Sequence, residues 1–232
     1  MKREAVIFDM DGVIVDSEPR HERAYLEVVR ELGYGDNHGL RFADYIGRTD
    51  QALWVDFVRK HQPAQTLEDL LAMKRRRVVE IIRCEQPLFD GLPELVEKLS
   101  GSYRLALASG SERPIVDEVL ALKGLRRFFE ATVSGSDITR GKPEPEIFLR
   151  AAALLGVEPE GCWVIEDSKP GVAAGLAAGM RVIAITNTHP ARELRNATHV
   201  VEGYPQIERL LMADAFARPG GSHTRALPVR RP

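Results

Sequence analysis

The feature that most constrains the fold is an alternation of short apolar segments with helical patterns in the second half of the chain. Segments with the length and apolar composition of buried strands lie at 104–109, 131–135, 162–167, 181–186 and 198–201. Segments with helical periodicity separate them, at 113–122, 145–155 and 170–178. Apolar strands that alternate with helices are typical of a parallel sheet with both faces covered. With one more such strand at 5–8, the pattern predicts the α/β class and a Rossmann-like three-layer core with a parallel sheet.

A long stretch after the first strand breaks this alternation. Between residue 16 and about residue 87 the sequence shows helical periodicity and no strand pattern. In one part of it, Leu26, Val29 and Leu32 recur at i, i+3 and i+6 on one helix face. We therefore expect an all-helical cap at 16–87, inserted into an α/β core that consists of 1–15 and 88–213.

Composition excludes several classes of protein. The chain of 232 residues is 44% hydrophobic and 28% charged, which is unlike a disordered, collagen-like or disulfide-stapled chain. Its 32 basic and 34 acidic residues give a net charge of −2, whereas a dedicated nucleic-acid binder normally shows a basic surplus. No apolar run approaches the roughly 20 residues that span a bilayer. We therefore expect neither a nucleic-acid nor a membrane partner.

The C-terminal end differs in composition from the rest. Its last fifteen residues contain three Pro, two Gly and four Arg and no acidic residue, so they bury too little apolar surface to offset the entropy cost of ordering. We expect a flexible tail at 214–232. Without those four arginines, the other 217 residues carry a net charge of −6. The two cysteines, Cys84 and Cys162, form no CxxC pair, which favours a reducing, cytoplasmic location.

Acidic side chains gather where predicted strands end. Asp9 and Asp11 follow the first strand, and Glu166 and Asp167 end the strand at 162–167. In an open parallel sheet, ligands bind outside the carboxyl ends of the strands. Either pair taken alone also fits an acidic turn or a helix cap. Together the two pairs offer the hard oxygen ligands that Mg²⁺ prefers.

Two more segments add groups that suit an anion. Ser109, Gly110 and Ser111 lead from a strand into a helix, where hydroxyls and free backbone N–H groups bind anions. Lys142 lies on a turn before the next helix. Ordinary helix capping by Ser111 and a solvated lysine are the alternatives. Combined with the carboxylates, these groups predict a site at which Mg²⁺, serine and lysine hold a phosphate, with carboxylates left for nucleophilic attack and proton transfer.

Four segments of the chain carry recognisable motifs: FDMDGVIVDSEP (8–19), LALASGSERP (105–114), GKPEPEIF (141–148) and VIEDSKPGVAAGLAAGM (164–180). In this order they resemble the motifs of the haloacid-dehalogenase-like (HAD) hydrolases. Over about residues 4–212 the chain is similar to the helical-cap subgroup that contains sugar-phosphate phosphatases and β-phosphoglucomutase. The resemblance implies that the cap lies between the first two motifs.

The resemblance also implies a role for each polar group. Asp9 would attack phosphorus and carry a transient aspartyl phosphate, and Asp11 would act as general acid and then as general base. Ser109 and Lys142 would hold the phosphoryl oxygens. The implied Mg²⁺ ligands are Asp9, Asp11 (through its backbone carbonyl), Asp167 and, directly or through water, Glu166.

The cap in this subgroup supplies contacts to the leaving group. The candidates here are His21, Arg48 and Lys74, and Gly110 and Ser111 complete the expected substrate contacts. Packing at a hinge is the alternative for His21, and a solvated helix face is the alternative for Lys74. Arg48 follows a glycine at a cap turn, in a segment that resembles the family's cap specificity loop with its arginine offset by one position.

The expected function is that of a phosphoric monoester hydrolase: a Mg²⁺-dependent phosphatase for a small phosphorylated metabolite, with sugar phosphates as the expected class. We expect a monomer or weak dimer. The alternatives are a phosphomutase of the β-phosphoglucomutase type and a catalytically silent binding protein with the same fold. Glu112 and Arg113 stand where the mutase-like pattern carries a Lys-Asn pair, and the run at 16–19 resembles the phosphatases. Both features favour the phosphatase.

Overall fold

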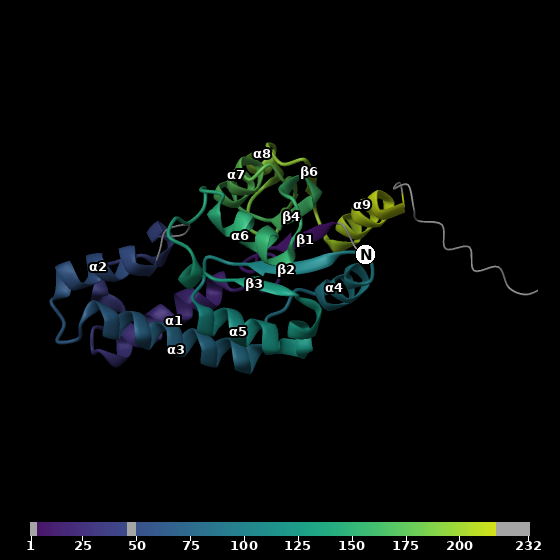
Figure 1. The fold of residues 1–232 in the computed structure, drawn as a ribbon. Helices are drawn as coiled ribbons and strands as arrows, with labels where there is room; N and C mark the ends of the chain where they lie inside the picture. Colours follow the sequence, from purple (N-terminus) through teal and green to yellow (C-terminus); the bar gives the residue numbers. More distant parts are fainter. Residues whose placement is uncertain (1–3, 46–49, 217–232) are drawn as a thin grey trace, which may run out of the picture.

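The structure, a computed structural model, describes residues 4–45 and 50–216. Its centre is a six-stranded sheet in the order β3-β2-β1-β4-β5-β6, and every pairing is parallel (Figure 1). The strands are β1 Ala5–Phe8, β2 Arg104–Ala108, β3 Ala131–Val133, β4 Cys162–Glu166, β5 Arg181–Ile185 and β6 His199–Val201. The predicted α/β class with a parallel sheet is confirmed.

Both faces of the sheet are covered, which explains why its strands are apolar without alternation. In β1, Val6 and Phe8 enter one hydrophobic cluster while Ala5 and Ile7 enter another on the opposite face. The first face is covered by α4 Leu92–Ser100, α5 Arg113–Ala121 and α9 Tyr204–Phe216. The second face is covered by α6 Glu146–Leu155, α7 Lys169–Ala177 and the short α8 Ala191–Leu194. The short 3-10 segments of this part are η3 Leu122–Phe128, η4 Gly135–Asp137 and η5 Pro159–Gly161.

In the sequence, a group of helices comes between β1 and β2. In space, this group extends away from the sheet (Figure 1). It consists of α1 Glu18–Glu31, η1 Gly35–His38, η2 Phe42–Tyr45, α2 Asp50–His61 and α3 Leu67–Glu85. This helical insert has an aromatic core of its own, in which Trp54 packs edge-on against Tyr25 and Phe57. The described part of the insert is helical, as the sequence pattern predicts.

The last helix of the insert, α3, packs against two different cores. Leu70, near its start, belongs to the aromatic core of the insert. Val78 and Ile82, in its second half, are fully buried in the same cluster as Val116 of α5. Helix α3 therefore ties the insert to the sheet layer along its C-terminal half.

Helices α4, α8 and α9 of the core were not predicted from the sequence. Helix α4 places Leu92, Leu95, Val96 and Leu99 against the sheet, and α9 packs beside α4. Helix α9 continues to Phe216, three residues into the range expected for the tail, and residues 217–232 lie outside the described part. Among the described residues, no helix is long and apolar enough to cross a membrane.

Candidate active site

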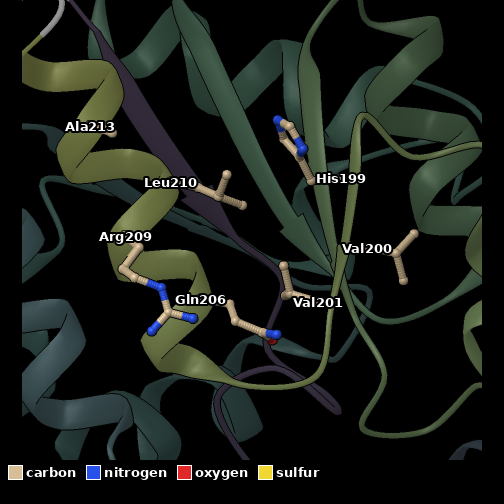
Figure 2. Close-up of a pocket in the computed structure, with 7 residues that line it drawn as sticks. All are labelled: His199, Val200, Val201, Gln206, Arg209, Leu210 and Ala213. Carbon is tan, nitrogen blue, oxygen red and sulfur yellow. The ribbon is translucent and has the colours of Figure 1, made fainter.

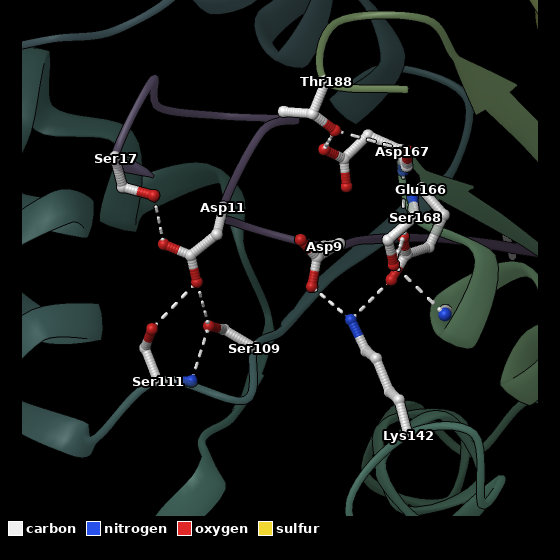
Figure 3. Close-up of polar contacts among 11 residues, drawn as sticks. Asp9, Asp11, Ser17, Ser109, Ser111, Lys142, Glu166, Asp167, Ser168 and Thr188 are labelled. Carbon is white, nitrogen blue, oxygen red and sulfur yellow. Dashed lines mark hydrogen bonds and ion pairs between the residues drawn. The ribbon is translucent and has the colours of Figure 1, made fainter. Parts of the chain in front are cut away.

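Strand order brings the predicted polar residues together. Strand β1 lies between β2 and β4, and Phe8 at its end is level with Leu107 on one side and Ile165 on the other. The next residue, Asp9, therefore emerges beside Glu166 at the end of β4, and Ser109 follows β2 on the other side. Figure 3 shows these side chains converging at the carboxyl edge of the sheet.

Three carboxylates form a compact buried group at this edge. Asp9, Glu166 and Asp167 each offer an oxygen, and these oxygens lie within 4.8 Å of one another. Lys142, which precedes α6, reaches the group with its Nζ, 2.5 Å from Glu166 Oε1, and it also pairs with Asp9 (Figure 3). Three carboxylates and one ammonium group therefore share a site with little solvent.

The electrostatics of this group fit a divalent cation. Burial raises the pKa of Asp9 well above its usual value, against the attraction of Lys142. Burial and then the charge of Glu166 raise the pKa of Asp167 to about 7. Burial alone would lower the pKa of Lys142, but attraction to Asp9 and Glu166 outweighs it and raises that pKa, so the ammonium form persists. The carboxylates carry more negative charge than one lysine balances, and oxygen donors of this kind suit Mg²⁺.

Glu166 is held in a fixed orientation. Its Oε2 accepts hydrogen bonds from the backbone N–H groups of Asp167 and Ser168 and from the Ser168 hydroxyl, each at 2.9 Å. Gly171 in the first turn of α7 leaves room for this carboxylate, because a Cβ there would stand 1.7 Å from Glu166 Oε1. The glycine is therefore a steric requirement of the site.

Asp11 lies in a separate environment made of serine hydroxyls. Ser17 donates a hydrogen bond to its Oδ1 at 2.6 Å, while Ser109 and Ser111 donate to its Oδ2 at 3.1 and 2.8 Å (Figure 3). Residues 109–111, called the serine loop below, are further ordered by a hydrogen bond from the Ser111 N–H to the Ser109 hydroxyl at 3.0 Å. The Asp11 side chain is not part of the three-carboxylate group, so its carboxylate differs in setting from that of Asp9.

The structure brings together two of the three candidates from the insert. Lys74 on α3 is buried and its Nζ lies 3.2 Å from Nδ1 of His21 on α1. The Lys74 charge also acts on Glu18 at the start of α1, whose pKa is raised by burial and then by Asp11. Glu18 therefore lies within electrostatic range of both Asp11 and Lys74. Arg48 lies outside the described residues.

Sequence reasoning missed three hydroxyl residues of the site. Ser17 belongs to the run at 16–19 that carries the resemblance, but no role was expected for it. Ser168 follows the acidic pair, and its hydroxyl accepts a hydrogen bond from the N–H of Gly171 at 3.2 Å in addition to contacting Glu166. Thr188, in the loop after β5, donates a hydrogen bond to Asp167. The sequence signal for Thr188 was its position shortly after the predicted strand at 181–186.

Comparison with known proteins agrees with this geometry. The family model described as haloacid dehalogenase-like hydrolase matches residues 4–179. The chain belongs to the haloacid dehalogenase-like hydrolase family. The predicted family is therefore confirmed, and with it the expectation of an enzyme of the hydrolase class.

Relatives in this family include named phosphatases. The chain is 34% identical over 194 residues to hexitol phosphatase B of Escherichia coli (strain K12), covering 83% of this chain and 86% of the relative. It is 31% identical over 182 residues to fructose-1-phosphate phosphatase YqaB of the same organism, covering 78% and 95%. A crystal structure described as a putative β-phosphoglucomutase from Thermotoga maritima superposes with a TM-score of 0.73 at 28% identity, covering 90% of this chain and 99% of that one.

A separate cavity of about 400 Å³ lies between β6 and α9 (Figure 2). His199 from the strand and Gln206 and Arg209 from the helix are among its lining residues. None of the converging carboxylates or serines lines it. The cavity is therefore distinct from the candidate active site of this hydrolase.

Proposed function

We propose that this HAD-like hydrolase is a Mg²⁺-dependent phosphatase that hydrolyses a small phosphomonoester, with sugar phosphates as its substrate class. The observation that carries the proposal is the buried group of Asp9, Glu166 and Asp167 with Lys142, beside an Asp11 held by serines. The names of the two relatives, hexitol phosphatase and fructose-1-phosphate phosphatase, support the substrate class.

In the first step a carboxylate oxygen of Asp9 attacks phosphorus, and the ester P–O bond breaks. Asp11 donates a proton to the departing alkoxide, so the alcohol leaves and an aspartyl phosphate remains. The hydroxyl of Ser109 and the ammonium group of Lys142 hold the equatorial phosphoryl oxygens, where charge gathers in the transition state. Lys142 also orients Asp9 through their ion pair.

In the second step Asp11 accepts a proton from water. The water oxygen attacks phosphorus, the bond between phosphorus and Asp9 breaks, and inorganic phosphate leaves. The same residue can serve as acid and base because the serine hydroxyls that contact it can donate or accept hydrogen bonds.

The metal site is assigned to Asp9, Asp167 and the backbone carbonyl of Asp11, with Glu166 as a further direct or water-mediated partner. Mg²⁺ supplies a positive charge that removes the repulsion between a carboxylate nucleophile and a phosphate dianion. Thr188 and Ser168 orient the two carboxylates at the end of β4.

We further propose that residues 16–87 act as a cap, with 1–15 and 88–213 as the catalytic core. His21 and Lys74 then contact the leaving group, and Arg48 does so from the cap turn. A cap over the site excludes water before phosphoryl transfer. The cytoplasmic location and the monomer or weak dimer stay predictions.

The phosphatase is favoured over a phosphomutase by the pairing of two residues. Glu112 forms an ion pair with Arg75, and Arg113 forms one with Asp137. Both side chains therefore already have a charged partner within the protein. They stand at the positions where the mutase-like pattern carries phosphate-binding residues. With β-glucose 1-phosphate we expect release of inorganic phosphate and no glucose 6-phosphate.

The test is phosphate release from a panel of phosphorylated sugars and from p-nitrophenyl phosphate. We expect Asp9→Asn to abolish turnover and EDTA to do the same for the wild-type enzyme, with activity restored by Mg²⁺. Asp16→Asn, which changes a partly exposed carboxylate near the site, serves as the control and should keep most activity. Full activity of Asp9→Asn, or of the wild type after complete chelation, would contradict the mechanism.

A further inference from the structure

Helix α3 of the insert and helix α5 of the core lie side by side (Figure 1). Two ion pairs join them. Arg75 pairs with Glu112, and Arg83 pairs with Glu118, with 2.7 Å between Nη2 and Oε2. The second pair lies about two helical turns further along both helices. The two pairs are therefore similar in chemistry but differ in their distance along α5 from the serine loop.

Glu112 occupies a position at which its residue type is unusual. It is the N-cap residue of α5 and makes no side-chain hydrogen bond to the first turn of that helix. N-caps favour Ser, Thr, Asp and Asn, whose short side chains reach the free N–H groups. Helix capping therefore does not account for Glu112, and the contact that its carboxylate makes is with Arg75 of the insert.

On its other side, the serine loop that precedes Glu112 contacts the start of η4. The Ser111 carbonyl accepts a hydrogen bond from the Gly135 N–H at 2.9 Å. A Cβ at Gly135 would stand 2.2 Å from the carbonyl oxygen of Gly110, so the two loops are in close contact. Between these anchors, Ser111 donates its hydroxyl hydrogen bond to Asp11.

We propose that Glu112 is a positioning residue: its ion pair with Arg75 ties the insert to the serine loop and thereby sets Ser111 against Asp11. The inference rests on the proposed function, in which Asp11 protonates the leaving group. Loosening the pair lets the serine loop shift and weakens proton transfer to a poor leaving group. A good leaving group such as p-nitrophenolate departs without that proton and is unaffected.

The experiment compares kcat/KM for two substrates: p-nitrophenyl phosphate and the sugar phosphate that the wild-type enzyme hydrolyses fastest. Arg75→Gln and Glu112→Gln should each lower kcat/KM for the sugar phosphate about two- to fivefold, the range that an exposed ion pair supplies. Their kcat/KM for p-nitrophenyl phosphate should stay at the wild-type value. The charge-swapped double variant Arg75→Glu/Glu112→Arg should recover most of the loss.

Arg83→Gln and Glu118→Gln are the matched controls, because they break an ion pair between the same two helices. They should leave both substrates unaffected. Equal losses on both substrates, no loss, or the same loss in the controls would overturn the inference while leaving the phosphatase assignment intact. A wild-type enzyme that hydrolyses neither p-nitrophenyl phosphate nor any phosphorylated sugar of the panel would contradict the proposed function and this inference with it.

Discussion

At the scale of single residues, the site requires a glycine at position 171 in addition to its carboxylates. Gly171 lies in the first turn of α7, the helix after β4, and the Glu166 carboxylate occupies the space that a Cβ would need. We expect Gly171→Ala to displace Glu166, lowering Mg²⁺ affinity and turnover by tenfold or more, although alanine favours a helix by about 1 kcal/mol over glycine. Mg²⁺ titration of activity and circular dichroism are the measurements. Ala173→Ser on the exposed side of the same helix is the control.

We expect Asp167 to make the stability of the metal-free protein depend on pH. Its pKa is raised to about 7 by burial and then by Glu166, so the folded protein holds this proton more tightly than the unfolded chain. The stability that protonation contributes is present at low pH and is lost as the pH rises from the unfolded value towards 7.

The variant Asp167→Asn carries no ionisable group at this position, so it should not lose stability in this way as the pH rises. In EDTA we expect its melting temperature to exceed that of the wild type by more at pH 8 than at pH 5. The change in that difference should be at least about 2–4 °C, the shift that 1 kcal/mol gives in a chain of this size. Mg²⁺, which binds the deprotonated carboxylates, should stabilise the wild type more at pH 8. A difference that is constant with pH would contradict the assignment.

The predicted site residues that the structure brings together lie at the ends of neighbouring strands. Asp9 and Ser109 directly follow β1 and β2, and Glu166 is the last residue of β4. A parallel sheet places these three positions at the same edge. Thr188 could not be predicted, because its contact with Asp167 requires knowing that β5 lies beside β4 and how its loop turns back. Hydroxyl residues are also common in every loop, so their type carries little information.

At the scale of elements, the C-terminal helix is attached to the sheet by a polar contact at the end opposite the active site. Asp214 of α9 accepts hydrogen bonds from the Trp163 indole at 3.0 Å and from Arg181 at 3.1 Å. The Arg181 guanidinium lies over the Trp163 ring, 4.1 Å from its centroid. The carboxylate therefore satisfies two donors that β4 and β5 present to the helix.

We expect Asp214→Ala to destabilise the protein by about 1–3 kcal/mol, because it leaves partly buried donors without their acceptor. Urea denaturation measures the difference. Asp117→Ala removes an acid that forms a more exposed pair with Arg126 and should cost at most about 1 kcal/mol. Equal effects of the two substitutions would show that the Asp214 contact adds nothing beyond a surface ion pair.

Sequence patterns predicted where the strands lie, but not which elements each helix packs against. The strands of the sheet are buried on both faces, so their apolar runs stand out. Helix α3 shows one continuous helical period, yet its first half packs in the insert and its second half against α5. Hydrophobic periodicity indicates that a helix has a buried face. It does not indicate whether the insert or the core covers that face. The double attachment of the insert could therefore not be foreseen.

At the scale of the whole molecule, shortened chains can test whether the fold requires helix α9. Ile207 and Leu211 of α9 are fully buried in the main core, and the Tyr204 hydroxyl donates a hydrogen bond to the Val13 carbonyl at 2.7 Å, close to the active-site loop. Burying one such apolar side chain contributes about 1.5–3 kcal/mol, and a domain has only about 5–15 kcal/mol of net stability. Loss of α9 therefore removes most of the margin.

We expect a chain ending at Phe216 to keep the melting temperature and kcat/KM of the full chain, because it retains α9 with Asp214. A chain ending at Gly203 should lose its cooperative thermal transition and its activity. Calorimetry and phosphate release compare the three lengths under the same conditions. A large loss in the chain that ends at Phe216 would contradict the predicted tail, and would instead assign the basic residues 217–232 a part in holding the acidic body together or in attracting an anionic substrate.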